Sequence, residues 1–141
     1  MVKHVVAFTT AMLVTSAGTA FAQQCLHGAN EAPEQAARRK EAITAARTVH
    51  NIQANRGGGP LYFRHDELAA APHAQTMKTS TNETTRRISL DPLGDILPGW
   101  KLTLDVSREG YWFMIKDRTD PCGFAFVSNQ DGLIYTAQPL R

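Results

Sequence analysis

The chain has 141 residues, of which 20% are charged, and its formal net charge is +2 at neutral pH. This length allows one modest globular core. The mixed charge excludes a protein built around a strongly basic, nucleic-acid-binding face, because the densest basic cluster, Arg38-Arg39-Lys40, is followed at once by Glu41. Such a cluster is typical of the solvated side of a helix.

The first 22 residues have the layout of a secretory signal peptide. Lys3 and His4 give a basic start, an apolar run follows, and small residues end in Ala20-Phe21-Ala22. The apolar run is shorter than the roughly 20 residues of a membrane-spanning helix, and several threonines dilute it. We therefore predict cleavage after Ala22, no stable membrane anchor after cleavage, and a secreted or periplasmic protein whose single domain spans residues 23–141.

Two cysteines, Cys25 and Cys122, lie in the exported part. An even number of cysteines in an oxidising compartment favours a disulfide. Neither cysteine belongs to the Cys-x-x-Cys pair of a redox protein. We therefore predict a structural bridge between Cys25 and Cys122 that ties the start of the domain to its last hairpin.

Residues 33–55 are predicted to form one long N-terminal amphipathic helix. Strong helix formers dominate the segment, and Pro33 suits a first helical turn. Apolar residues recur at helical spacing and give the helix one face for a core: Ala42, Ala45, Val49 and Ile52, with Ile43 and Ala46 beside them. The run Gly57-Gly58-Gly59-Pro60 should then stop the helix.

Residues 61–89 have the least regular pattern of the chain. Residues 66–71 favour a short helical turn that Pro72 ends. Residues 73–87 are polar and rich in Ser and Thr, which predicts an exposed loop or an irregular strand.

The last third of the chain predicts four strands joined by short turns. Apolar and polar residues alternate most clearly in 100–106, the period of a half-buried strand. Short runs rich in aromatic and branched residues follow at 111–116, 123–128 and 133–137. Because short connections favour antiparallel neighbours, we predict an α+β domain in which the helix packs on a four-stranded antiparallel meander.

The motifs of catalytic, metal and cofactor sites do not occur in the sequence. The histidines of the mature chain lack the His-x-x-x-His spacing of a zinc-binding helix: His27, His50, His65 and His73. No Gly-x-Ser-x-Gly nucleophile motif occurs either. Asp117, Asp120 and Asp131 fall in predicted turns, where carboxylates commonly bond the backbone. We therefore predict a non-enzymatic protein without a cofactor, and the alternative is a small hydrolase that uses these aspartates and His65.

The aromatic residues are concentrated in the predicted sheet, whose alternating strands must turn some of them away from the helix. An outward set that includes Trp112 and Met114 would form an apolar patch. We take Trp112 and Met114 as the candidate contact surface for another envelope or secreted protein, with the loop at 61–89 as a second candidate. The alternative is that a segment such as 61–68 covers the patch.

Several stretches are similar to the globular part of type IV pilins and secretion pseudopilins. These stretches are 45–51 in the helix, 68–70 after it and 123–135 at the end, within a similarity that spans residues 36–138. The order of helix, irregular connection and antiparallel meander also resembles that family. The chain lacks the prepilin cleavage site and the hydrophobic helix that follows it. The resemblance therefore implies a pilin-like soluble domain with a binding or accessory role outside a filament core.

The cystatin fold also has one helix wrapped by a four-stranded meander. The Gln-Val-Val-Ala-Gly wedge of the cystatins does not occur in this sequence. A cystatin-like secreted inhibitor is therefore an alternative function within the binding class.

Overall fold

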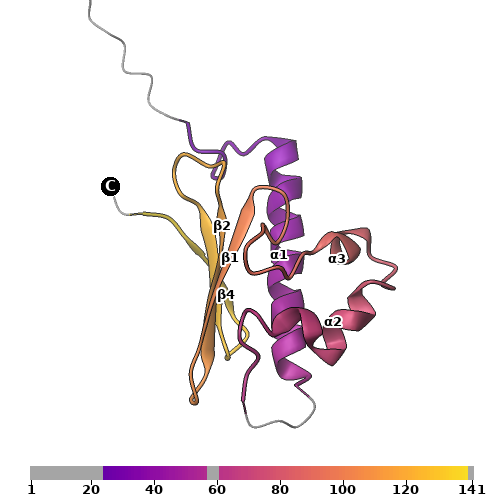
Figure 1. Ribbon diagram of the computed structural model, residues 1–141. Coiled ribbons are helices and arrows are strands. Elements are labelled where there is room, and N and C mark those ends of the chain that lie inside the picture. Colours follow the sequence, from indigo (N-terminus) through magenta and orange to yellow (C-terminus); the bar gives the residue numbers. More distant parts are fainter. Residues whose placement is uncertain (1–23, 57–60, 140–141) are drawn as a thin grey trace, which may run out of the picture.

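The computed structural model describes residues 24–56 and 61–139. They form an α+β fold with one antiparallel sheet and a helix of 22 residues against one of its faces (Figure 1). The predicted signal peptide, residues 1–22, and the predicted helix stop at 57–60 lie outside the described residues. Within the described ranges, every helix is too short or too polar to span a lipid bilayer.

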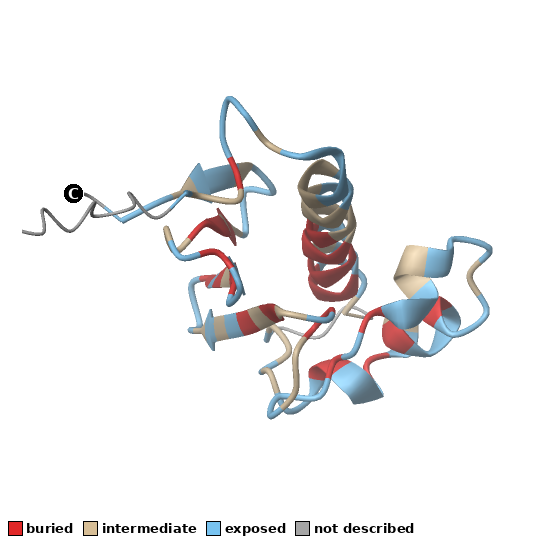
Figure 2. Ribbon diagram, turned by 90° about the horizontal axis from the view of Figure 1, so that it is seen from above, coloured by how far each residue is buried: buried red, intermediate tan, exposed pale blue. Residues whose placement is uncertain are grey.

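Helix α1 spans Pro33–Ala54, with proline in its first turn, where a missing N–H costs nothing. The predicted apolar stripe is fully buried, with 0% exposure at each of its four positions: Ala42, Ala45, Val49 and Ile52. Burial continues round the helix to Thr48 and Gln53. The reason is visible in Figure 2, where α1 lies between the sheet and the short helices that follow it.

The sheet has the order β1-β2-β3-β4, and neighbouring strands are antiparallel throughout. Its strands are β1 (Trp100–Val106), β2 (Tyr111–Asp117), β3 (Ala125–Asn129) and β4 (Ile134–Ala137). Each bound lies within two residues of the range predicted from the sequence. Large side chains on the face toward α1 fill the core, among them Trp100, Leu102, Phe113, Ile115 and Phe126.

The prediction of a loop or irregular strand at 73–87 is wrong, because this segment contains two short helices. Helix α2 spans Pro72–Met77 and α3 spans Glu83–Arg87. The short helical turn predicted at 66–71 is present and ends before Pro72, which also opens α2, since proline suits the first helical position. The preceding turn is a short 3-10 helix, η1, at Leu68–Ala70. Helices this short depend on tertiary packing, and buried Ala74 and Met77 provide it for α2.

A disulfide joins Cys25 to Cys122, as predicted, across a sequence separation of 97 residues. The two Cα atoms lie 5.2 Å apart. The bridge fastens the segment before α1 to the turn between β2 and β3. Asp120 supports the same junction, because one of its carboxylate oxygens accepts from the N–H groups of Leu26 (3.3 Å) and Cys122 (2.9 Å).

Candidate functional site

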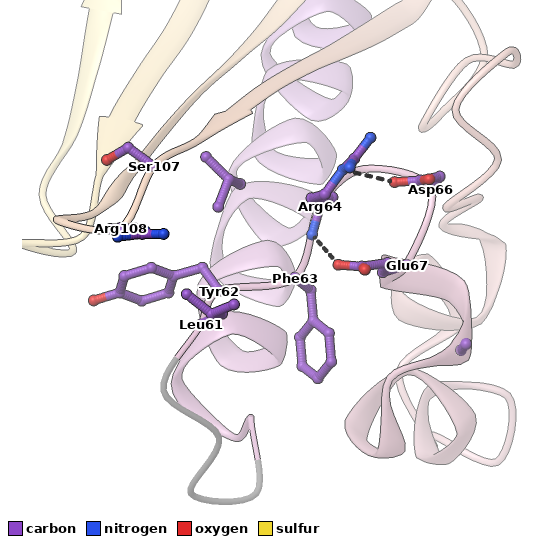
Figure 3. A pocket seen from close by; sticks show the side chains of 10 residues that line it. Leu61, Tyr62, Phe63, Arg64, Asp66, Glu67, Ser107 and Arg108 are labelled. Atoms are coloured by element: carbon purple, nitrogen blue, oxygen red, sulfur yellow. Dashed lines mark hydrogen bonds and ion pairs between the residues drawn. The ribbon is translucent and has the colours of Figure 1, made fainter.

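A hollow of about 760 Å³ lies between the segment 61–67 and the end of β1 (Figure 3). Its walls are mostly apolar and include Tyr62, Phe63, Ala70 and Val106, while charged side chains such as Arg64 and Arg108 form the rim. Figure 3 shows Tyr62 and Phe63 leaving the segment in different directions. A mostly apolar hollow of this size with a few polar groups has the character of a binding site.

Gln53, a fully buried side chain of α1, fixes the segment that forms one wall of this hollow. Its amide nitrogen donates to the carbonyl of Phe63 at 2.8 Å, and its amide oxygen accepts from the N–H of Phe63 at 2.9 Å. Tyr62 packs edge-on against Tyr111, with the ring centres 4.9 Å apart. The guanidinium of Arg56 lies 4.3 Å from the centre of the Tyr62 ring, a cation–π contact.

A second hollow of about 410 Å³ adjoins the first along β1. The two share Arg64, Asp66 and Val106, and the second adds Leu104 and His65. Burial, helped by the charge of Lys101, lowers the pKa of His65. Together the two hollows border β1 from Leu104 to its end.

The outer face of the sheet carries the candidate contact surface, Trp112 and Met114. All the described helices lie on the opposite side (Figure 1). Met114, Val127 and Tyr135 stand side by side across three strands. Trp112 is 43% exposed and Tyr135 is 56% exposed. The segment 61–67 borders the end of β1 on the core side, so Trp112 and Tyr135 stay exposed, while Met114 and Val127 are half-buried.

The apolar row of the outer face has a basic end. Lys101 and Lys116 lie directly opposite each other on β1 and β2. They line, with Arg118, a hollow of about 470 Å³. At the other end, the indole N–H of Trp112 donates to Asp105 at 3.1 Å.

His50 of α1 forms a continuous hydrogen-bond chain with the sheet. Its Nδ1 lies 2.7 Å from the hydroxyl of Tyr111, and its Nε2 lies 2.7 Å from the hydroxyl of Ser128. The hydroxyl of Ser128 donates its hydrogen bond to the carbonyl of Leu133. His50 must therefore donate from Nε2 to Ser128 and accept at Nδ1 from Tyr111. In this arrangement the imidazole does not act as a base toward the serine, so the pair lacks the direction of a catalytic Ser–His pair.

The pKa values of this chain agree with that arrangement. Burial lowers the pKa of His50, which favours the neutral ring. Burial also raises the pKa of Tyr111 to about 12, which keeps its hydroxyl a donor.

A second buried network surrounds His27, whose ring contacts a carboxylate at each nitrogen. Nδ1 lies 2.7 Å from Glu31, and Nε2 lies 2.8 Å from Asp117. Burial works to raise the pKa of Asp117, but hydrogen bonds from Thr119 and His27 outweigh it and the pKa is lowered. The pKa of Glu31 is lowered chiefly by its hydrogen bonds with Arg39. Since ionised carboxylates only accept, the ring of His27 lies between two hydrogen-bond acceptors.

These contacts correct the reading of the basic cluster at 38–40 as merely solvated. Arg39 holds Glu31 with two nitrogens, at 3.0 and 2.9 Å. Arg38 reaches the fully buried Asp117 at 3.4 Å. The two arginines therefore help to fix the segment before α1 on the end of the sheet.

The residues of the hydrolase alternative are distributed over separate environments. Asp117 is buried in the His27 network, and Asp120 bonds the backbone beside the disulfide. Asp131 is exposed and pairs with the side chain of Asn129 at 3.0 Å. His65 borders a different hollow from Asp120. Among the described residues there is also no group of His, Cys, Asp or Glu side chains placed to hold a metal ion.

Sequence reasoning missed His27, His50 and Gln53 as organising residues. His27 and Asp117 are 90 positions apart, and His50 and Ser128 are 78 positions apart. The sequence offered one signal of these buried polar residues, a polar side chain beside the apolar stripe. Gln53 follows Ile52 directly and is buried with it.

The chain matches no protein-family model, and comparisons with the curated proteins and with the solved structures found no match.

Proposed function

We propose that this chain is an exported, non-enzymatic binding or accessory protein that contacts another envelope or secreted protein through the outer face of its sheet. The observation that carries the proposal is the apolar row formed by the half-buried Met114 and Val127 and the exposed Tyr135, with the exposed Trp112 beside it. The solvated face of an antiparallel sheet normally carries polar side chains. A contiguous apolar patch in that place is typical of a contact surface.

The composition of this face supports a protein partner. Trp, Tyr and Met are enriched at protein interfaces, and exposed aromatics commonly dominate their binding energy. Lys101 and Lys116 add positive charge at one end only. The partner should therefore place acidic side chains over that end and apolar side chains over Trp112 and Met114. The chain's net charge of +2 is too small to support nucleic-acid binding.

The leader and the disulfide support export to a secreted or periplasmic location. The first 22 residues have the pattern of a cleaved signal peptide, and disulfides persist in oxidising compartments. Cleavage after Ala22 makes α1 the long N-terminal helix of a single domain, residues 23–141, without a membrane anchor. The order of helix, irregular connection and four-stranded meander supports a pilin-like soluble domain in an accessory role.

The hydrogen bonding within the His50 and His27 clusters supports a non-enzymatic role. The Ser128–His50 pair is satisfied by its own neighbours, and the His27–Asp117 pair is fully buried between α1 and the sheet. In both clusters the histidine, the serine and the buried aspartate already have hydrogen-bond partners within the protein.

Site-specific photo-crosslinking in the exporting cell tests the proposal. A benzophenone amino acid at the position of Met114 or Tyr135 should give one discrete adduct with an envelope or secreted protein. The same group at the exposed Arg47 of α1 serves as the matched control and should give none. The Trp112→Ala variant should reduce the Tyr135 adduct at least fivefold. Equal adducts at all three positions, or none on the sheet face, would contradict the proposal.

A further inference from the structure

The free edge of β1 has backbone groups that nothing in the described chain satisfies. The N–H of Ser107 donates to Gly110 and the N–H of Arg118 donates to Gly99, each at 2.8 Å. Because antiparallel bonding alternates, the odd-numbered residues of β1 bond β2, and the even-numbered residues point to the free edge. Trp100 is satisfied there by Ile96 and Leu97, at 2.8 Å each. The N–H groups of Leu102, Leu104 and Val106 donate to no described residue, and their C=O groups accept from none.

The segment opposite this edge is held on α1 through the backbone of Phe63. Gln53 bonds both backbone groups of Phe63, as a neighbouring strand would. Figure 3 shows the side chains of Tyr62 and Phe63 leaving the segment in different directions.

The two hollows described above lie between this segment and β1. They have volumes of about 760 and 410 Å³, and Val106 borders both. The space therefore combines a row of unused strand-type donors and acceptors with a larger, mostly apolar hollow and a smaller one lined chiefly by polar side chains, among them His65, Asp66 and Asp105. An exposed strand edge of this kind is a template for another strand.

We propose that the β1 edge binds an extended peptide segment of a partner protein, which adds to the sheet as a fifth strand. This inference concerns a surface separate from Trp112 and Met114. Backbone hydrogen bonds to Leu104 and Val106, which border the hollows, supply affinity, and side chains that enter the hollows supply selectivity.

The geometry also specifies the pattern of the peptide. Leu102, Leu104 and Val106 turn their side chains toward the core, and residues directly opposite on paired strands share a face. The peptide residues that bond β1 therefore place their side chains toward Tyr62, Phe63 and Ala70. These residues should be apolar, and the alternate ones, which face solvent, should be polar. The rim carries both Arg64 and Glu67, so no net charge is favoured.

The probe is an acetylated heptapeptide amide in which valine and phenylalanine alternate with threonine. Amide hydrogen exchange, followed by NMR, should slow at least tenfold at Leu104 and Val106 when the peptide is saturating. The amides of Thr103 and Asp105 already bond β2 and provide an internal control that should change little. N-methylation of the apolar residues should abolish this protection, while N-methylation of the threonines should preserve it.

A matched pair of variants tests the hollow. Ala70 and Ala69 are both exposed in η1, but only Ala70 lines the larger hollow. Ala70→Trp should weaken peptide binding at least tenfold, and Ala69→Trp should change it less than twofold. The inference is overturned if the peptide protects neither edge amide at millimolar concentration. It is also overturned if protection rises with protein concentration alone, since a second copy of the chain would then be the occupant.

Discussion

At position 50 an imidazole connects α1 to two strands, and its neighbours require it to be neutral. Tyr111 donates to one nitrogen and Ser128 accepts from the other. Burial lowers the pKa of His50 below the usual value of about 6.5. Between the two pKa values the unfolded chain binds more protons than the folded one, so stability must rise with pH in that range. This contribution is complete above about pH 6.5 and is lost as the pH falls, and His65, whose pKa is also lowered, adds in the same direction.

The His50→Gln variant should be less stable at pH 7.5 by about 1–3 kcal/mol, because it leaves Tyr111 or Ser128 without a well-placed partner. It should also lose less stability than the wild type between pH 7.5 and pH 5.5, because the titrating group has gone. Denaturant unfolding at several pH values measures both effects. Equal pH slopes for the two proteins would show that His50 does not carry a lowered pKa.

The residue scale is also where sequence reasoning had least power. Asp120 lies in the predicted turn and bonds the backbone there, whereas Asp117, also predicted to lie in a turn, is the last residue of β2. Nothing in the sequence shows that Asp117 is fully buried against His27, because that contact forms only when residues 90 positions apart meet. The tautomer of His50 likewise depends on partners from two different strands.

At the scale of elements, one side chain of α1 fixes the position of the segment 61–66. Gln53 supplies a donor and an acceptor to Phe63 and has no exposure to solvent. The segment in turn forms a wall of both hollows beside β1. A substitution of Gln53 should therefore alter the wall of the proposed peptide site, although Gln53 does not line either hollow.

Gln53→Leu should lower the free energy of unfolding by about 1–3 kcal/mol, because two buried backbone groups of Phe63 lose their partners. The matched control is Asn51→Ala, an exposed position on the same helix, which should stay within about 0.5 kcal/mol of the wild type. The local readout is the exchange rate of the Phe63 amide, which should rise in Gln53→Leu and stay unchanged in Asn51→Ala. A loss of stability without faster exchange at Phe63 would contradict this account.

The elements differ in how far the sequence determines them. Strand β1 follows its predicted range of 100–106 because a half-buried strand imposes a strict period of two. Helices α2 and α3 were missed because six and five residues are too few to show a helical period. The signals for them are local: Pro72 at a first helical position, and Asn82, whose side chain accepts from the N–H of Thr85 at 3.0 Å.

For the whole molecule, contacts around the disulfide fix the segment before α1 on the sheet. Covalent and non-covalent links act on the same few residues. Cys25 is bonded to Cys122, Leu26 donates to Asp120, and His27 contacts Asp117. Because the non-covalent links hold the native geometry on their own, the bridge should stabilise the protein mainly by restricting the unfolded chain.

This view makes a specific prediction for the Cys25→Ala/Cys122→Ala double variant. A loop of about 100 residues corresponds to roughly 4–5 kcal/mol in the chain-entropy model, and measured effects are often smaller, so we expect a loss of about 2–5 kcal/mol. The folded variant should keep the wild-type chemical shifts of His27 and of the β2–β3 turn, because the hydrogen bonds there do not need the sulfur atoms. Denaturant unfolding measures the loss, and NMR of the folded variant measures the geometry. Shifts that change throughout the His27 network would show instead that the bridge acts by holding the native junction together.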